Sequence, residues 1–130
     1  MVIDSSAIIA VLFDEPEAAT FLSLLASADM CRLSAASLVE IGLVLRRQGT
    51  DGQRLALEEM LRLFAIQIEP VTEEQGRQAI VAYDRFGKGT GHPAGLNYGD
   101  CFSYALAKQT GEPLLFKGND FGRTDLGAAC

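Results

Sequence analysis

Four acidic residues of this 130-residue chain interrupt stretches that are otherwise apolar or built from small residues: Asp4, Glu40, Asp100 and Asp120. Burying a carboxylate in such surroundings is unfavourable unless a cation compensates its charge. Carboxylates that gather in one place repel one another unless cations hold them, and their hard oxygen atoms select Mg²⁺ or Mn²⁺. If the fold brings these four side chains together, they predict a divalent-cation site.

Local structure offers another explanation for three of these acids. Glu40 could complete a capping box with Ser37, although Ser34 is the better-placed N-cap and would leave Glu40 about two turns inside its helix. Asp100 would be the third residue of a helix, where its charge suits the cap and the helix dipole. Asp120 could be an ordinary turn residue. Only the four acids together, in this order and spacing, indicate a site.

The elements that would position these acids alternate along the chain. Short runs rich in apolar residues predict strands, and longer runs with helical periodicity predict helices between them. The expected strands are 2–4, 31–33, 66–68 and 113–116, and the expected helices are a short turn at 7–12 and longer helices at 17–28, 34–47, 51–64, 72–86 and 97–110. Strands separated by helices imply an α/β fold with a central parallel sheet flanked by helices on both faces. Ligands bind at the carboxyl edge of such a sheet.

Specific residues should delimit these elements. Asp51 is expected to cap the helix 51–64, and Thr72 with Gln75 to form the capping box of the next helix. Residues 87–96, which are dense in glycine, are expected to form a loop. This loop lacks the Lys-Ser/Thr ending of a P-loop and does not follow a strand, so we do not expect it to bind a nucleotide.

Length and composition predict one soluble domain. The chain has no repeat, linker or long apolar run, so we expect a single domain over residues 1–130 and no membrane association. The N-terminus lacks the basic region of a signal peptide, which predicts a cytoplasmic protein. Three cysteines without metal-ligand spacing are expected to be reduced, with Cys31 and Cys101 in the core and Cys130 at the end of the chain.

The net charge of −6 argues, taken alone, against binding to nucleic acid. Between residues 77 and 123, however, six basic residues outnumber four acidic ones, so the charge is unevenly distributed. An acidic protein can also act on a phosphate group when divalent cations bridge its carboxylates to the substrate. The charge therefore leaves nucleic acid open as a substrate, and it also suits a basic protein partner.

The sequence resembles the PIN-domain ribonucleases, and within them the VapC-type toxins of bacterial toxin–antitoxin pairs. The matching stretches are VIDSSA at residues 2–7, SLVE at 37–40, GLNYGDCFSYALA at 95–107 and LLFKGNDF at 114–121. They lie across nearly the whole chain, which also has the usual length of the family. The resemblance implies a PIN-like three-layer fold with a central parallel sheet flanked by helices, here as a single PIN domain.

The resemblance also implies an activity, the hydrolysis of RNA phosphodiester bonds aided by Mg²⁺ or Mn²⁺. Asp4 and Asp100 would be the principal metal ligands, and Glu40 and Asp120 would complete the catalytic site directly or through water. Family members vary after the last strand, so Asn119 is an alternative to Asp120, which we favour. A cognate antitoxin that places an Arg or Lys in the acidic site is the implied partner, and we expect a homodimer. Helices 17–28 and 55–64 are candidate surfaces for these partners.

Several other residues have a candidate role near the site. Ser6 is expected to bond a site carboxylate or a capping amide, or to be a simple turn residue. The only histidine, His92, should have a structural or phosphate-contacting role rather than act as a general base. Tyr98 is expected to pack beside the site, with base stacking as the alternative. The candidate phosphate contacts, or otherwise solvated surface charges, are Lys88, Lys117 and Arg123.

Two rival functions stay open at this point. The first is a catalytically silent PIN-like module that serves only protein interaction, which loss of the site acids would indicate. The second is a phosphatase of the haloacid-dehalogenase type with Asp4 as nucleophile. Such sites usually have a second Asp two residues further on, where this chain has Ser6.

Overall fold

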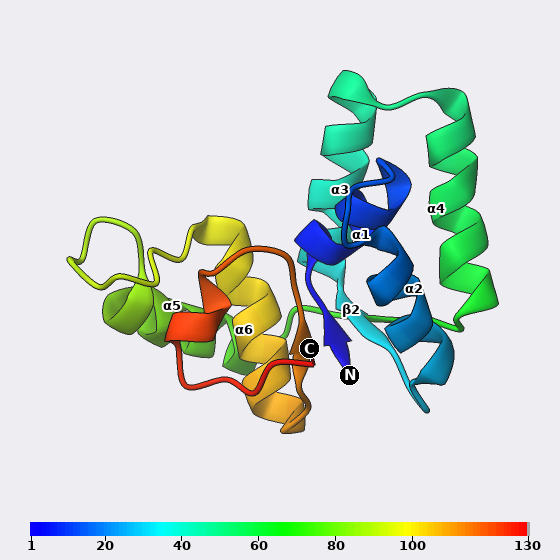
Figure 1. Ribbon diagram of the computed structural model, residues 1–130. Helices are drawn as coiled ribbons and strands as arrows, with labels where there is room; N and C mark the ends of the chain where they lie inside the picture. The colour runs from blue at the N-terminus through cyan, green and yellow to red at the C-terminus, as the bar shows by residue number, and fades with distance from the viewer. Residues whose placement is uncertain (130) are drawn as a thin grey trace.

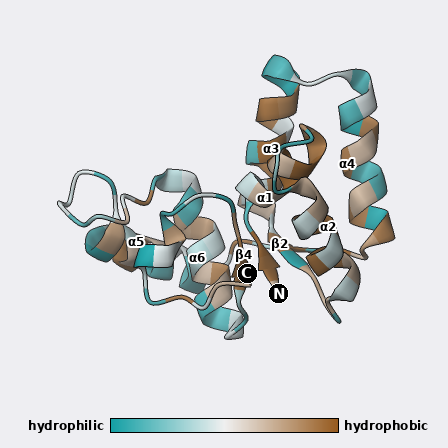
Figure 2. Ribbon diagram, viewed as in Figure 1, coloured by the Kyte–Doolittle hydropathy of each residue, from teal (hydrophilic) through white to brown (hydrophobic). Residues whose placement is uncertain are grey.

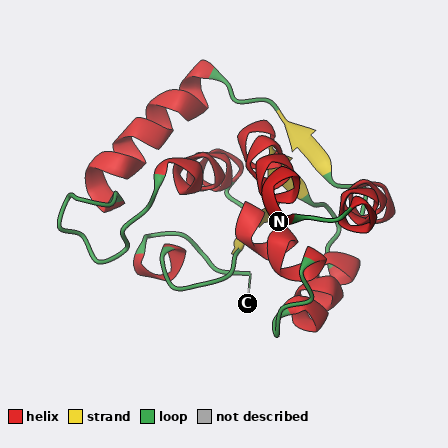
Figure 3. Ribbon diagram, turned by 90° about the horizontal axis from the view of Figure 1, so that it is seen from above, coloured by secondary structure: helices red, strands yellow, loops and turns green. Residues whose placement is uncertain are grey.

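The computed structural model describes residues 1–129 as an arrangement of short strands and longer helices. The strands are β1 (Val2–Ile3), β2 (Arg32–Ser34), β3 (Gln67–Glu69) and β4 (Leu114–Leu115). The helices are α1 (Ser5–Leu12), α2 (Ala18–Ser27), α3 (Ala35–Gln48), α4 (Asp51–Leu63), α5 (Glu73–Phe86) and α6 (Tyr98–Thr110), followed by the 3-10 helix η1 (Phe121–Arg123). Figure 3 shows that most of the chain is helix or loop and that the strands are short.

The four strands form one parallel sheet in the order β3-β2-β1-β4. The chain moves outward from β1 to β2 and β3 and then returns to place β4 on the other side of β1. This confirms the predicted α/β class with a central parallel sheet. The strand order reverses between β1 and β4, and the carboxyl ends beside such a reversal are where open α/β sheets bind ligands.

Helices cover the two faces of the sheet in separate groups. Helices α1 to α4 lie on one side and α5 with α6 on the other, as Figure 1 shows. Alternation along the strands supplies both hydrophobic cores, because Ile3 and Leu115 pack with the first group while Val2 and Leu114 pack with the second. Figure 2 shows the hydrophobic β1 between the two groups. By the same alternation, Asp4 belongs to the side of α6.

The caps of α4 and α5 differ from the prediction, α1 begins two residues earlier than expected, and each strand has at least one end shifted by one residue. Thr50, and not Asp51, is the N-cap of α4, because its side chain and that of Gln53 form a reciprocal capping box. At α5 the Thr72 hydroxyl accepts from the backbone N–H of Gln75 as expected, but the buried Gln75 side chain donates to Gln109 on α6 instead of turning back. Strand β1 ends at Ile3, one residue earlier than predicted.

Other local predictions concern the cysteines and the glycine-dense residues 87–96. Cys31 and Cys101 are buried free thiols, as expected, while Cys130 lies outside the described residues. Residues 87–96 form a loop in which Gly89, Gly91 and Gly95 have positive φ. Within residues 1–129, no helix is both long and apolar enough to span a membrane.

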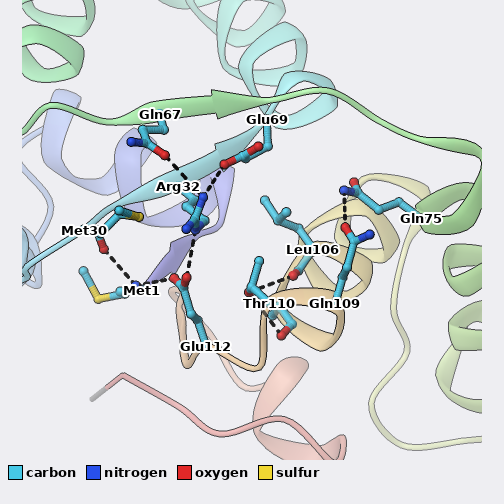
Figure 4. A network of polar contacts seen from close by, with 11 residues as sticks. Met1, Met30, Arg32, Gln67, Glu69, Gln75, Leu106, Gln109, Thr110 and Glu112 are labelled. Carbon is cyan, nitrogen blue, oxygen red and sulfur yellow. Dashed lines mark hydrogen bonds and ion pairs between the residues drawn. The ribbon is translucent and has the colours of Figure 1, made fainter.

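A polar network ties the amino ends of the strands together, at the edge opposite the carboxyl ends. The Met1 ammonium and the Arg32 guanidinium both contact the carboxylate of Glu112, just before β4. Arg32 also donates to Gln67 and Glu69 of β3, so that the group joins all four strands (Figure 4). These contacts connect the strands at the amino-terminal edge of the sheet. The four acidic residues lie at the opposite, carboxyl-terminal edge.

Candidate active site

The four predicted acids come from four segments that end or begin at the carboxyl edge of the sheet. Asp4 follows β1, Glu40 lies on α3, Asp100 lies in the first turn of α6, and Asp120 comes after β4. The negative charges of Asp4, Asp120 and Glu40 all act on the carboxyl group of Asp100. The fold therefore brings the four acids to one locality.

Asp4 is almost completely buried, with 2% of its surface exposed. Its Oδ2 accepts the backbone N–H of Ser6 at 3.0 Å, which makes Asp4 the N-cap of α1. Its Oδ1 accepts the hydroxyl of Ser103 on α6 at 2.6 Å. Asp4 thus has a local structural role, as the N-cap of α1, that the sequence interpretation, which made it the last residue of the strand, did not foresee. Both oxygens nevertheless hold further lone pairs.

Glu40 lies inside α3, so it has no part in capping that helix. The N-cap is Ser34, whose hydroxyl accepts the N–H of Ala36 at 3.2 Å, as predicted. The Ser5 hydroxyl at the start of α1 donates to Oε1 of Glu40. The other oxygen, Oε2, lies against Gly99 of α6, where a Cβ would overlap it. Glu40 is therefore held between the starts of α1 and α6.

Asp100 combines a capping role with membership of the acidic group. The Asn97 side chain accepts the N–H of Asp100 at 2.9 Å, and Oδ2 of Asp100 accepts the N–H of Asn97 at 2.9 Å. Burial raises the pKa of Asp100 to about 7, the Asn97 N–H opposes that rise, and the nearby carboxylates of Asp4, Asp120 and Glu40 add to it. The capping hydrogen bond alone would lower the pKa of Asp100. The raised pKa therefore comes from burial and from the neighbouring negative charges, not from the capping role.

Asp120 and Asn119 differ in their surroundings. Asp120 is exposed just before η1, and its charge contributes to the raised pKa of Asp100. Asn119 lines a cavity together with Glu17 and Lys117. This difference supports Asp120 as the fourth member of the acidic group.

The donor set agrees in its chemistry with a hard divalent cation. All four side chains offer carboxylate oxygens, the ligands that Mg²⁺ and Mn²⁺ prefer. The pKa of Asp100 is raised first by burial and then by the carboxylates of Asp4, Asp120 and Glu40. Across residues 1–129, however, no three Asp, Glu, His or Cys side chains are grouped closely enough to hold a metal ion as they stand. Cation binding would require these carboxylates to approach one another further.

Two of the three basic residues proposed as phosphate contacts have protein partners. The Lys117 ammonium pairs with Glu15 and lies 3.5 Å from Glu17, and the Arg123 guanidinium donates to the carbonyl of Pro93 at 3.3 Å. These partners favour a structural role for both cations. Lys88 is exposed in the glycine-dense loop.

Three other predicted neighbours of the site are placed more clearly. The Ser6 hydroxyl accepts the N–H of Lys117 at 3.0 Å, so it ties the segment after β4 to α1 and does not bond a carboxylate. The ring of His92 packs edge-on against Phe86, and its Nδ1 accepts an N–H from Ala94, which is a structural role. Tyr98 packs edge-on against Phe102 and lines a cavity with Glu40, so it lies beside the site as expected, although 79% of its surface is exposed.

Sequence reasoning missed three residues that touch the acids: Ser5, Ser103 and Gly99. Ser103 lies three residues after Asp100 on the same helix, and it is a fully buried polar residue among apolar ones. Ser5 directly follows Asp4. A search for small polar residues one or three positions from each acid would have found both serines.

The chain is similar to known proteins in both sequence and fold. A family model described as PIN domain matches residues 1–126. Ribonuclease VapC28 of Mycobacterium tuberculosis is 56% identical over 95% of this chain and 93% of its own length. Ribonuclease VapC42 of the same species is 42% identical over 100% of this chain and 99% of its own.

Solved structures with low sequence identity have the same fold. The toxin VapC20 of M. tuberculosis, described as cleaving the sarcin–ricin loop, superposes with a TM-score of 0.71 at 20% identity, covering 96% of this chain and 95% of its own. FitAcB of Neisseria gonorrhoeae superposes with a TM-score of 0.67 at 21% identity, covering 98% of this chain and 94% of its own.

Proposed function

The chain belongs to the PIN-domain family, among its VapC ribonucleases, and we propose that it is an endoribonuclease toxin that uses Mg²⁺ or Mn²⁺ to hydrolyse RNA phosphodiester bonds. The observation that supports this most directly is Asp100. Its pKa is raised to about 7 by burial and by the carboxylates of Asp4, Asp120 and Glu40. Carboxylates that repel one another at the carboxyl edge of a parallel sheet are suited to binding a cation.

In this proposal Asp4 and Asp100 supply the principal ligand oxygens, and Glu40 and Asp120 complete the site directly or through water. A bound divalent cation supplies positive charge against the phosphodiester and lowers the pKa of water. The chain contributes orientation, because Asp4 and Asp100 are held at the starts of α1 and α6 by hydrogen bonds from backbone N–H groups. His92 accepts an N–H from Ala94 and packs against Phe86, so we give it no catalytic role and assign the reaction to the carboxylates.

Metal-dependent cleavage of RNA tests the function. The purified chain, free of antitoxin, is incubated with single-stranded RNA in the presence of Mg²⁺, of Mn²⁺, or of a chelator. We expect cleavage with either cation and intact RNA with the chelator. RNA that stays intact under all three conditions would favour the alternative, a catalytically silent PIN-like interaction module.

Replacing Gly99 by Ala is expected to reduce cleavage while leaving the fold intact. A Cβ at Gly99 would lie 2.9 Å from Cδ of Glu40 and closer still to Oε2, so the carboxylate must move. Because this carboxylate is the end of a flexible side chain, the helix itself tolerates the change, and Ala favours a helix by up to ~1 kcal/mol over Gly. We expect the cleavage rate to fall about tenfold. This is the lower end of the loss of activity commonly seen when a residue that orients a metal ligand is changed.

The matched control for this prediction is Gly76→Ala on α5, where nothing lies within 4 Å of the added Cβ. That variant should cleave RNA at the parent rate. Thermal melting measured on both variants separates a local displacement of Glu40 from a loss of fold. A Gly99→Ala protein that cleaves at the parent rate would contradict the proposed position of Glu40 in the site.

We further propose that a cognate antitoxin inhibits the enzyme by placing an Arg or Lys among the four carboxylates, since a cationic side chain relieves their repulsion. An apolar surface adjoins the acids: Val39, Leu43 and Tyr98 are exposed and line one cavity with Glu40. Such a surface would suit the apolar residues beside that basic side chain. This surface lies on α3 and α6, whereas the helices expected from the sequence to bind partners are 17–28 and 55–64.

The chain is also proposed to form a homodimer. Leu55 on α4 is 72% exposed and Ile80 on α5 is 65% exposed, so each helix offers an apolar surface that a second copy would bury. Sedimentation should give a species of twice 14.0 kDa. The variants Leu55→Glu and Ile80→Glu identify the face, because only the one at the interface should yield monomer. A single 14.0 kDa species for the parent chain would contradict the dimer.

A further inference from the structure

Two of the four acids are held by hydroxyl groups that come from other segments of the chain. Ser103 on α6 donates to Oδ1 of Asp4 at 2.6 Å, across 99 residues of sequence. Ser5, the first residue of α1, donates to Oε1 of Glu40 on α3. Each serine lies within three residues of one acid in the sequence and bonds another in space, which links the start of α1 to α3 and α6 around the site.

The direction of the hydrogen bonds at Ser103 follows from its single hydroxyl proton. That proton goes to Asp4, so the contact of 3.2 Å between the Ser103 and Ser37 hydroxyls must be donated by Ser37. The result is a directed chain from Ser37 through Ser103 to Asp4. All three are buried, with 2%, 0% and 2% of their surface exposed, so water does not compete for these bonds.

A hydroxyl group suits this place for an electrostatic reason. A Lys or Arg beside Asp4 would neutralise the carboxylate and compete with a cation for it. A serine hydroxyl carries no net charge, so it fixes the orientation of the carboxylate and leaves its negative charge and remaining lone pairs available. In a helix interior, a serine hydroxyl commonly bonds a carbonyl of the preceding turn, whereas Ser103 donates to Asp4.

We propose that Ser103 and Ser5 are positioning residues, which orient the carboxylates of Asp4 and Glu40 for a divalent cation. The inference rests on the proposed function, because it presumes a cation at these acids. Partners that orient metal ligands commonly affect metal affinity by about 10- to 100-fold. Loss of either hydroxyl therefore weakens cation binding more than it weakens the fold.

The test measures Mn²⁺ affinity by isothermal titration calorimetry on the full chain, together with the melting temperature. The variants are Ser103→Ala, Ser103→Cys, Ser5→Ala and the control Ser23→Ala, an exposed serine on α2 whose hydroxyl bonds the Ala19 carbonyl. Cysteine nearly matches serine in volume but is a weak donor. We expect both Ser103 variants and Ser5→Ala to weaken Mn²⁺ binding by about tenfold. Ser103→Cys should keep the parent melting temperature, and Ser23→Ala should match the parent in both.

A second readout separates positioning from direct catalysis. Because the serines act through cation affinity, raising the Mn²⁺ concentration should restore RNA cleavage by Ser103→Ala toward the parent rate. The inference is overturned if Ser103→Ala binds Mn²⁺ as the parent does, or if Ser103→Cys recovers the parent affinity, since volume alone would then explain the serine. If the parent binds no Mn²⁺, or binds it as well after Asp100→Asn, the proposed metal site fails and the inference fails with it.

Discussion

Replacing Asp100 by Asn is expected to abolish RNA cleavage and, at the same time, to stabilise the protein in the absence of divalent cations. The cleavage rate should fall about a thousandfold or more, because losing a metal ligand removes several kcal/mol of transition-state stabilisation. The fold should persist, since Asn at position 100 can still accept the N–H of Asn97, and its backbone N–H can still donate to the Asn97 side chain that caps the helix. Stability should rise because the substitution removes a charge that is unfavourable through burial and through the nearby carboxylates of Asp4, Asp120 and Glu40.

The same substitution should remove a pH dependence of stability. In the folded chain the pKa of Asp100 is raised to about 7 from its ordinary 3.8, so the folded state binds more protons than the unfolded state between these two values. The contribution of Asp100 to the free energy of unfolding therefore falls as the pH rises from about 4 to about 7, and it is constant above pH 7. Each pKa unit corresponds to ~1.4 kcal/mol, so the total change amounts to a few kcal/mol at most.

Chemical denaturation of the chelator-treated protein at several pH values measures this effect. The difference in stability between Asp100→Asn and the parent should be small near pH 4 and largest at pH 7 and above. A constant difference across this range would show that Asp100 titrates normally and that the acids do not crowd it. Retention of RNA cleavage by Asp100→Asn would remove Asp100 from the metal site.

Replacing Asp4 by Asn is the second substitution with a large expected effect. Asparagine is as good an N-cap as aspartate, so α1 should keep its start and the protein should fold. The substitution removes the negative charge that a cation needs at this position, and cleavage should fall about a thousandfold or more. RNA cleavage assays and circular dichroism on the same preparation measure the two consequences separately.

A matched control is Asp84→Asn, an exposed aspartate on α5 that is not among the charges acting on Asp100. It removes one negative charge without touching the site and should cleave RNA at the parent rate. An Asp4→Asn protein that loses its fold would mean that Asp4 serves mainly as the cap of α1 and partner of Ser103. One that folds and cleaves normally would remove Asp4 from the metal site.

The order of elements and the class of fold could be predicted from local patterns. Runs such as 2–4 and 113–116 are short and apolar, and the segments between them have helical periodicity, so the alternation that leads to a parallel sheet is visible in the sequence. The cap of α3 at Ser34 was also predictable, because capping depends on residues within one turn. The four acids were identified by the same local contrast with their surroundings.

Capping was less predictable where two neighbours compete or where a side chain finds a distant partner. Thr50 precedes Asp51 and caps α4 with the help of Gln53, a choice that the positions of the backbone decide. The side chain of Gln75 had a local partner available at Thr72, but it is buried against α6 and donates to Gln109 there. Burial changes which hydrogen bond is more favourable, and burial is a property of the packed chain.

The sequence by itself determined which residues are acidic, which strands and helices carry them, and that parallel strands would collect them at one edge. Only the tertiary structure decided what each acid contacts. Asp4 meets Ser103 from 99 residues away, and Glu40 meets Ser5 and Gly99. Local periodicity specifies which face of an element a residue occupies, whereas these contacts depend on how α1, α3 and α6 pack against one another. That packing brings the site together, and no single segment contains it.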